Sequence, residues 1–247
     1  MSKALRIPLD QLAAGVCPLP APLGRYVSRV HRLVPGDRLV VFDPDAATEA
    51  DACLVEGPAP EVWCRIEAPR ASGYRPLPIH LLQGLGKADK PDEVIRAATA
   101  LGAASVTLVQ TERSVARVVP ERGATKLERY RRIAVEAARQ CGRGDIPRLC
   151  GPQPLSEALL TPASLRLVLG PDAPPLFERL ASWSGREPLV LLVGPEGGFD
   201  ASEKLAAEAA GFLPAQLGST TLRTELAGVA ALGALLAFHD ATPEARS

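Results

Sequence analysis

Two short apolar runs in the second half of the chain restrict its fold more than any other feature. Residues 165–169 read LRLVL and residues 189–193 read LVLLV, without the regular alternation that marks a strand with one face in water. Near-continuous apolar runs of this length are typical of strands that are covered on both faces, as in a parallel sheet flanked by helices. The two runs therefore predict buried strands of a parallel sheet.

The second part of the chain alternates between strand and helix patterns. Further strands are expected at 79–82 and 105–109, and helices at 91–101 and 126–140. Gly102 and Gly142 follow the two helices, at the position where glycine commonly ends a helix. Asp200 and Glu203 have the spacing of a capping box, which predicts another helix. An apolar segment at 226–238 is expected to be buried against a sheet or a partner subunit. The fold class predicted for this part is α/β.

The first part of the chain has a different pattern. Short strands are expected between turns that contain proline and glycine, at 38–42, 52–55 and 62–66. Closely spaced strands of this kind favour a small β-barrel. Residues 69–78 are rich in proline and are interpreted as a linker. We therefore expect one domain at residues 1–72 and a second at residues 73–247.

Composition excludes several classes of protein. No apolar run reaches the roughly 18 residues of a membrane span, and the first residues lack the apolar stretch of a signal peptide. A cytoplasmic protein without a membrane partner is expected. The five cysteines form no CxxC pair, and the three histidines do not complete a ligand spacing, so no metal is expected.

The formal net charge is zero, but the charges are unevenly distributed. Residues 1–38 carry six Lys and Arg against two acidic residues, and residues 121–148 carry eight against four. Such basic zones are typical of a surface that binds nucleic acid, although ordinary variation along a solvated surface explains them equally well.

Two loops of the second domain have the character of a ligand site. Residues 194–198 read GPEGG directly after an expected buried strand, where α/β sheets place ligands and glycine lets the backbone approach closely. Neither a P-loop nor a GxGxxG motif is present. Residues 217–225 read LGSTTLRTE and lead into the apolar segment. The first loop could be a tight structural turn, and Arg223 could either pair with Glu225 or face an anion.

Together these loops resemble the SPOUT methyltransferases, and more narrowly the ribosomal RNA small subunit methyltransferase E family, which methylates N3 of a uridine in 16S ribosomal RNA. Further segments resemble the same family, namely Val30-His31-Arg32 with Pro35-Gly36-Asp37 and Phe42-Asp43, Lys87 with Asp89-Lys90, Ala100-Leu101-Gly102, Thr111-Glu112-Arg113-Ser114, and Glu136-Ala137 with Gln140 to Pro147. This sequence departs from the family pattern at Ala100, Thr220 and Leu226.

The resemblance implies a C-terminal SPOUT α/β domain with a trefoil knot, a preceding PUA-like β-barrel that binds RNA, and a homodimer. It implies S-adenosylmethionine as cofactor, held largely by backbone groups. The residues expected to bind it are Leu169, Gly170, Gly194, Pro195, Glu196, Gly197, Leu217, Gly218 and Leu222.

The proposed catalytic residues follow from the chemistry of the acceptor. N3 of uridine bears a proton, and an arginine can stabilise the anion that forms when the proton leaves, so Arg223 is assigned this role. Glu225 is expected to orient Arg223 or to accept the proton. The ribosomal RNA partner is expected to contact a set of arginines, namely Arg6, Arg25, Arg29, Arg32, Arg139 and Arg143. The alternatives are another SPOUT activity, on ribose 2′-O or guanine N1, and an RNA-binding protein without catalysis.

Overall fold

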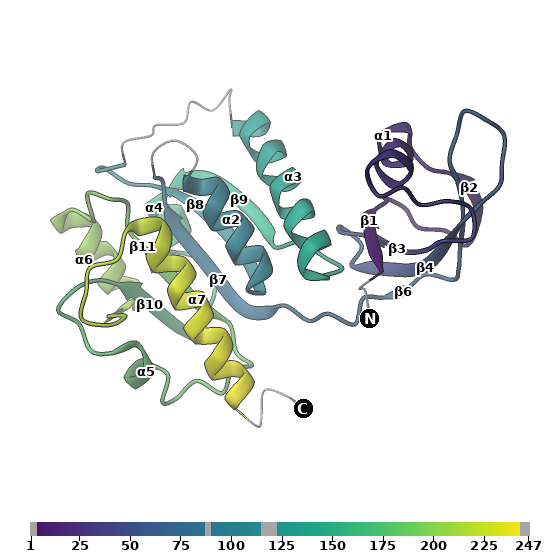
Figure 1. Ribbon diagram of the computed structural model, residues 1–247. Coiled ribbons are helices and arrows are strands. Elements are labelled where there is room, and N and C mark those ends of the chain that lie inside the picture. Colours follow the sequence, from purple (N-terminus) through teal and green to yellow (C-terminus); the bar gives the residue numbers. More distant parts are fainter. Residues whose placement is uncertain (1–3, 87–89, 115–122, 243–247) are drawn as a thin grey trace. The chain divides into compact units, whose positions relative to one another are not determined.

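The computed structural model describes residues 4–86, 90–114 and 123–242 of the chain (Figure 1). It consists of two compact units, Met1–Arg75 with Val135–Ile146 and Pro76–Ala134 with Pro147–Ser247. The first unit thus includes the end of helix α3 (Gly123–Cys141), which begins in the second unit.

The first unit is built around a mixed sheet. Its strands are β1 (Leu5–Pro8), β2 (Gly15–Pro18), β3 (Arg38–Asp43), β4 (Thr48–Val55), β5 (Trp63–Ile66) and β6 (Arg70–Ala71). The order is β1-β3-β4-β5-β2, with β6 paired to β4. β1 runs parallel to β3, and the other pairs are antiparallel. The strands expected at 38–42, 52–55 and 62–66 correspond to β3, the end of β4 and β5.

Alternation of side chains along the strands gives this unit its core. Ala50, Ala52 and Leu54 of β4 are buried and pack with Ile7 of β1 and Val41 of β3. A short helix α1 (Ala21–Arg25) continues into a π-helical turn η1 (Tyr26–Val30) between β2 and β3. Because every second residue of a strand points to the same side, the side of the sheet that carries Ala50, Ala52 and Leu54 is apolar and the opposite side meets solvent.

Three carboxylates of the first unit, those of Asp10, Asp43 and Asp45, lie within 4.8 Å of one another. The buried Asp43 accepts backbone N–H bonds from Gln11, Asp45 and Ala46 at 2.7 to 3.0 Å. The bonds from Asp45 and Ala46 stabilise the turn after β3, and the bond from Gln11 joins this turn to the segment after β1.

The second unit is an α/β structure around a fully parallel sheet. Its strands are β7 (Leu77–Gly84), β8 (Ala103–Gln110), β9 (Arg148–Pro154), β10 (Leu165–Leu169), β11 (Leu189–Val193) and β12 (Leu213–Ala215). The order is β12-β10-β11-β7-β8-β9, and every pair is parallel. The predicted parallel sheet is confirmed, and both apolar runs form interior strands of it. The prediction that both strands are buried holds for β11 but is wrong for β10, in which only Leu167 is buried. Besides the start of α3, the helices in the described part of this unit are α2 (Lys90–Ala100), α4 (Leu155–Ala158), α5 (Leu176–Arg179), α6 (Ala201–Ala209) and α7 (Thr224–Ala241).

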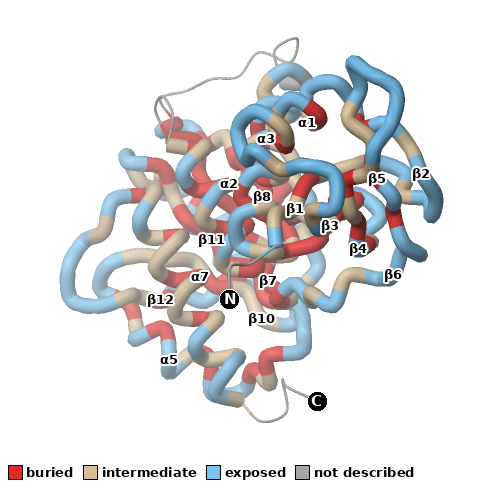
Figure 2. Tube along the Cα trace, turned by 45° about the vertical axis from the view of Figure 1, so that its right-hand side comes forward, coloured by how far each residue is buried: buried red, intermediate tan, exposed pale blue. Residues whose placement is uncertain are grey.

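Helices cover both faces of this sheet, which explains the apolar runs. All five residues of β11 are buried (Figure 2). Val190 and Leu192 pack on the side of α4 and α6. Alternate residues of a strand point to opposite faces, so Val193 lies on the other side, under α7 and near Gly228. In Figure 1, α2 and α7 lie together across this second face.

The helix boundaries match their sequence signals. Asp200 accepts the backbone N–H of Glu203 at 2.8 Å, and Glu203 accepts the backbone N–H of Asp200 at 2.9 Å, which completes the expected capping box of α6. Gly102 and Gly142 both have φ near +90°, which glycine adopts without strain at a helix end. Within residues 4–86, 90–114 and 123–242, no helix is long and apolar enough to cross a membrane.

Candidate active site

The loops that follow β10, β11 and β12 form the wall of a single cleft of about 900 Å³ in the second unit. Parallel strands present their carboxyl ends at one edge of a sheet, and this is where such folds bind ligands. The cleft brings together every position that was expected to bind the cofactor, namely Leu169, Gly170, Gly194, Pro195, Glu196, Gly197, Leu217, Gly218 and Leu222.

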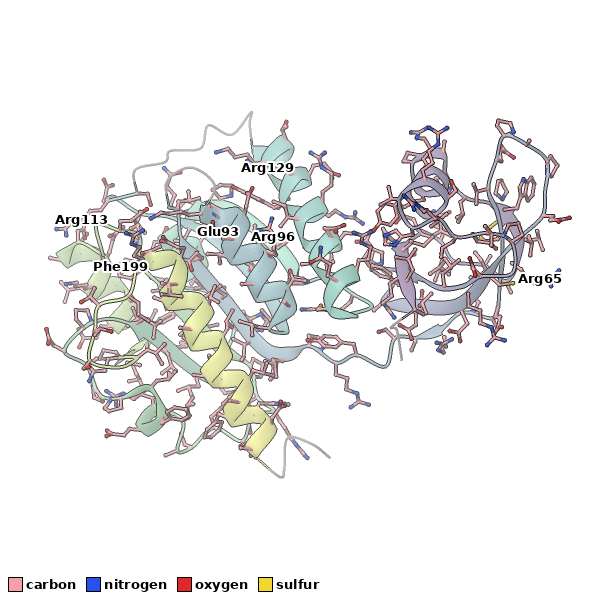
Figure 3. The ribbon with its side chains drawn as sticks, viewed as in Figure 1. Arg65, Glu93, Arg96, Arg113, Arg129 and Phe199 are labelled. Atoms are coloured by element: carbon pink, nitrogen blue, oxygen red, sulfur yellow. The ribbon has the colours of Figure 1, made fainter. Side chains whose placement is uncertain are left out.

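Close packing and a positive φ explain the glycines in and beside the GPEGG loop. A side chain on Gly84, at the end of β7, would lie 2.5 Å from the backbone nitrogen of Pro195. A Cβ atom on Gly194 would lie 3.0 Å from the ring of Phe199, which is buried and labelled in Figure 3. Gly198 has φ +66° and donates its N–H to the carbonyl of Pro195 at 2.9 Å. The loop is therefore a tight turn that is also fixed against the neighbouring strand.

Other glycines of the cleft leave open space where a side chain would project. A Cβ atom built on Gly170 or on Gly218 meets no atom within 4 Å, and both residues line the cleft. A cleft of this volume lies in the range of small-molecule sites. Backbone N–H and C=O groups next to this space can satisfy the donors and acceptors of an adenine ring, so the residues present fit a nucleoside cofactor.

The N-terminus of α7 is fixed to the GPEGG loop by one hydrogen bond. The hydroxyl of Thr224, Oγ1, donates to the carbonyl of Gly194 at 2.6 Å. Arg223 precedes Thr224 with extended backbone (φ −63°, ψ 147°), and its side chain makes no capping bond. The Arg223 side chain is exposed and lines the cleft beside the positive end of the α7 dipole. This placement gives the cleft a cation next to backbone N–H groups.

Glu225 pairs with Lys90, whereas the sequence suggested Arg223 as its partner. Lys90 Nζ lies 3.1 Å from Glu225 Oε2 and 3.0 Å from Glu196 Oε1. Burial acts to raise the pKa of Glu225, but a backbone hydrogen bond, Lys90 and the charge of Arg223 together hold this pKa below its usual range. The side chain is 15% exposed and is not among the residues that line the cleft.

Sequence reasoning assigned no role to several polar residues that line the cleft. These are Lys90, Arg113, Asp172, Lys204 and Gln216. Arg113 Nη1 donates to the carbonyl of Gly197 at 3.1 Å, and a Cβ atom on Gly197 would lie 3.0 Å from Arg113 Cβ. Lys90 and Arg113 both lie in motifs that resembled the family, and the position of these motifs after strands β7 and β8 was the available signal. Lys87 and Asp89 of the first motif lie outside the residues that the structure describes.

The six arginines proposed to contact RNA lie in the first unit, in different surroundings. Arg25, Arg29 and Arg32 are exposed, the last with φ +58°. Arg6 pairs with Glu49 at 2.8 Å and lies over the ring of Phe42, with 10% of its side chain exposed. Arg139 pairs with Glu136 and lies over the ring of Tyr26, with 15% exposed.

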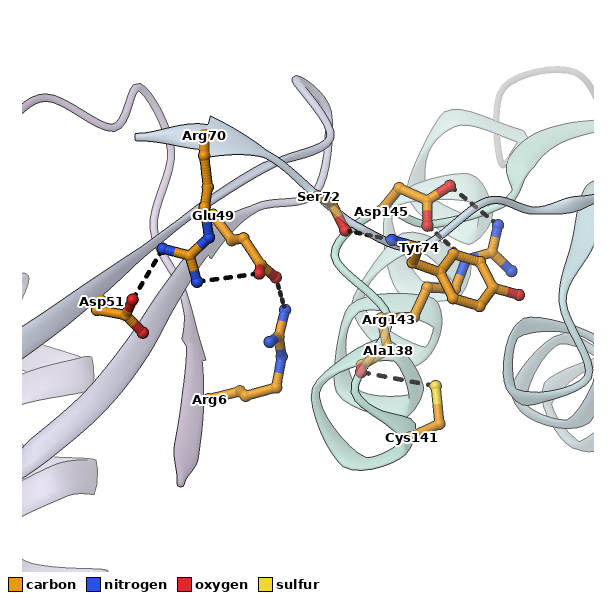
Figure 4. A network of polar contacts seen from close by, with 10 residues as sticks. All are labelled: Arg6, Glu49, Asp51, Arg70, Ser72, Tyr74, Ala138, Cys141, Arg143 and Asp145. Atoms are coloured by element: carbon orange, nitrogen blue, oxygen red, sulfur yellow. Dashed lines mark hydrogen bonds and ion pairs between the residues drawn. The ribbon is translucent and has the colours of Figure 1, made fainter. Parts of the chain in front are cut away.

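The assignment of Arg143 to RNA contact is wrong for this structure. Its side chain is 1% exposed, and its guanidinium makes a bidentate contact with Asp145 at 2.7 and 3.1 Å (Figure 4). The guanidinium also lies 5.0 Å from the centre of the Tyr74 ring. A buried, paired guanidinium has no face left for a phosphate, so Arg143 stabilises the unit instead.

Comparison with known proteins agrees with the fold and the cleft. Residues 74–236 match the family model described as an RNA methyltransferase domain. The parallel sheet with its cleft of three loops is thus that of an RNA methyltransferase. The chain is 31% identical to the ribosomal RNA small subunit methyltransferase E of Synechocystis over 96% of this chain and 78% of the relative. It is 33% identical to that of Mycobacterium tuberculosis, over 86% and 82% respectively.

Solved structures give the same result. A putative methyltransferase from Legionella pneumophila, in complex with S-adenosylmethionine, has a TM-score of 0.85 and 30% identity, over 96% of this chain and 98% of that one. A ribosomal RNA small subunit methyltransferase E from Neisseria gonorrhoeae, also bound to S-adenosylmethionine, has a TM-score of 0.83 and 27% identity over the same shares. The chain belongs to the ribosomal RNA small subunit methyltransferase E family, which confirms the resemblance found in its motifs.

Proposed function

We propose that this protein transfers a methyl group from S-adenosylmethionine to N3 of a specific uridine in 16S ribosomal RNA. The observation that carries the proposal is the cleft at the ends of β10, β11 and β12, with Arg223 in its wall. The names of the relatives support the RNA substrate, and the two neighbours bound to S-adenosylmethionine support the cofactor.

The cofactor is proposed to lie against the three loops, in contact with backbone groups of Leu169 and Gly170, of Gly194 to Gly197, and of Leu217 to Leu222. When bound, it supplies an electrophilic methyl group. The open space beside Gly170 and Gly218 provides room for the ligand, and the fixed turn of the GPEGG loop holds its backbone groups in place before binding. Such preorganisation contributes to affinity because less conformational entropy is lost on binding.

Arg223 is proposed to stabilise the acceptor. Loss of the N3 proton leaves a negative charge that is shared with the O2 and O4 atoms of uracil, and N3 becomes a nucleophile. A guanidinium beside the N-terminus of α7 stabilises this charge where it develops, which lowers the barrier more than it strengthens ground-state binding. Alignment of the base with the methyl group supplies a further part of the rate.

Of the two roles considered for Glu225, orientation fits the structure better than proton transfer. A carboxylate paired with Lys90, with its pKa below the usual range, is a weak base. Glu225 is separated from Arg223 by one residue and contributes to the field that acts on it. We therefore propose that Glu225 orients Arg223 and that the proton of N3 passes to a water molecule.

We propose that residues 1–72, which lie in the first unit, form a PUA-like β-barrel that binds the RNA, and that residues 73–247 form a knotted SPOUT domain. Arg25, Arg29 and Arg32 are exposed on this unit and can contact phosphates. A ribosomal substrate would place the protein in the cytoplasm.

A homodimer is proposed from the character of α7. This helix is apolar on nearly all sides, yet only Thr224, Gly228, Ala231, Leu232 and Leu235 are buried within the chain. Leu226 is 51% exposed. An isologous partner would cover the remaining apolar surface of the helix.

Mass spectrometry of 16S ribosomal RNA from cells with and without the gene tests the function. Loss of one N3-methyluridine in the deletion strain, restored by the wild-type gene, is expected. Loss of a ribose 2′-O-methyl or a methylguanine would instead support another SPOUT activity. Unchanged RNA, together with tight binding to it, would support a protein that has lost catalysis.

A further inference from the structure

One lysine of the second unit contacts two acidic residues from distant parts of the chain. Lys90 begins α2, whereas Glu196 lies in the GPEGG loop and Glu225 lies in the first turn of α7. Its Nζ atom lies 3.0 Å from one carboxylate and 3.1 Å from the other. Lys90 therefore connects the proposed cofactor loop to the helix turn that carries Arg223.

The stem of Lys90 has a defined path to this position. A Cβ atom on Gly86 would lie 3.2 Å from Lys90 Cδ and 3.5 Å from Glu196 Oε1, so a side chain there would press on the stem of the lysine and shift it. The side chains of Lys90, Glu196 and Glu225 are 30%, 28% and 15% exposed. The hydrogen bond to Glu196 and the ion pair with Glu225 raise the pKa of Lys90, so it stays charged at neutral pH.

An exposed pair of this kind would contribute little to stability. The contact of Lys90 with Glu196 and Glu225 differs from such a pair because both carboxylates contact the same ammonium group. Removal of its charge would take away the cation that the two carboxylates share, and like charges that both lie within 3.1 Å of one nitrogen repel. The first consequence would be movement of the loop away from the helix turn, which would change the cleft rather than unfold the protein.

We propose that Lys90 is a positioning residue that holds the GPEGG loop against the first turn of α7 by neutralising Glu196 and Glu225, and so sets the place of Arg223 relative to the bound cofactor. The effect on catalysis rests on the proposed function, whereas the effect on loop position does not. Misplacement of a catalytic group by about 1 Å can reduce a rate by roughly 10²-fold.

The test compares Lys90→Met, which keeps the apolar stem but removes the charge, with Lys90→Arg, which keeps the charge. Arg96→Met is the matched control, because Arg96 is an exposed cation on the same helix, labelled in Figure 3. We expect Lys90→Met to lower kcat by about 10- to 10²-fold. Hydrogen exchange of the backbone amides of residues 194–198 should become faster. Lys90→Arg should recover most of both properties, and the control should resemble the wild type.

The double variant Lys90→Met with Glu225→Gln separates repulsion from loss of contact. If the lysine acts by neutralising two facing carboxylates, removal of one of these charges should return amide exchange in residues 194–198 toward the wild-type rate. A double variant that exchanges faster than Lys90→Met would overturn this explanation. Wild-type exchange and wild-type kcat in a folded Lys90→Met protein would overturn the proposal itself.

These outcomes are distinguishable from a failure of the proposed function. If the wild-type protein methylates neither naked 16S ribosomal RNA nor the assembled small subunit, the proposed function fails. Amide exchange and the calorimetric affinity for S-adenosylmethionine still measure the position of the loop in that case. If Lys90→Met does not fold, the Glu196→Gln variant provides the test. An unchanged rate of amide exchange at the start of α7 in that variant would contradict the proposal that Lys90 holds the loop against the helix.

Discussion

The hydroxyl of Thr224 donates a 2.6 Å hydrogen bond to the carbonyl of Gly194, across thirty residues of sequence. Thr224 is 9% exposed, so water does not readily replace this bond. The bond joins the first residue of α7 to the first residue of the GPEGG loop. Two segments that line the same cleft thus share a fixed contact.

Thr224→Val should weaken the binding of S-adenosylmethionine. Valine has the shape of threonine but leaves the Gly194 carbonyl without its donor, at a cost of about 0.5–1.5 kcal/mol. The expected loss of affinity by calorimetry is roughly two- to tenfold. Thr224→Ser keeps the hydroxyl and serves as the control. Equal weakening in both variants would show that packing of the methyl group, and not the bond, is responsible.

Gly197→Val should abolish the binding of S-adenosylmethionine while the protein remains folded. A Cβ atom at this position would lie 3.0 Å from Arg113 Cβ, and the larger side chain would also displace the backbone that faces the cleft. Gly73→Val is the control, because a Cβ atom there meets nothing within 4 Å. Calorimetry on a folded Gly197→Val protein with wild-type affinity would remove this loop from the cofactor site.

The parts of the fold that could be predicted are those with a local physical cause. The run 189–193 indicated a doubly covered strand because burial on both faces requires apolar residues throughout, and it became β11. The capping box of α6 depends on residues three positions apart. By contrast, β9 contains Gly151 and Pro152, which oppose strand formation by propensity, and its pairing with β8 comes from tertiary context.

The sequence predicted which loops line the cleft, but not which residues of distant segments contact one another there. The GPEGG and LGSTTLR segments carry their own signals, and both line the cleft. Lys90 and Glu196 lie 106 residues apart, and no local pattern states that they meet. Arg143 was misassigned because a basic residue in a basic zone has the same sequence signature whether its guanidinium meets solvent or is buried against the ring of Tyr74. Knowledge of tertiary neighbours is required to separate the two cases.

RNA binding should depend on salt through the exposed arginines of the first unit. Arg29→Ala should reduce the slope of log K against log salt by roughly 0.7–0.9, as expected for the loss of one phosphate contact. Arg143→Ala should instead destabilise the protein by on the order of 3 kcal/mol, because Asp145 loses its buried partner. Filter binding at several salt concentrations and denaturant unfolding measure the two effects. An unchanged slope for Arg29→Ala would show that Arg29 contacts no phosphate and belongs to an ordinary solvated surface.

The protein should sediment as a dimer at micromolar concentration. Leu226→Glu should shift the equilibrium toward monomer, because it places a charge on the apolar helix α7 proposed as the interface. Leu205→Glu is the control, since Leu205 is 66% exposed on α6. Wild-type protein that sediments only at 26.0 kDa would contradict the dimer.

Removal of the Arg223 guanidinium should affect turnover far more than cofactor affinity. Arg223 lines the cleft and is proposed to act on charge that develops only as N3 loses its proton. Arg223→Ala should therefore lower kcat by on the order of 10² to 10³, as for other preorganised donors. Arg223→Lys should recover only part of this, because a point charge does not reproduce the planar fork of a guanidinium. Wild-type kcat with weakened cofactor binding in Arg223→Ala would make Arg223 a support of the cofactor loop.

The pH profile gives an independent measure of the same step. The pKa of Glu225 is held below its unfolded value of 4.5, so its ionised form stabilises the fold above that pH, and this contribution is lost as the pH falls through the folded-state pKa. Glu225 therefore does not titrate near neutrality. We expect log kcat to rise with pH as N3 of uracil ionises more readily, and to rise more steeply in Arg223→Ala. An inflection near neutral pH that disappears in Glu225→Gln would instead identify Glu225 as the proton acceptor.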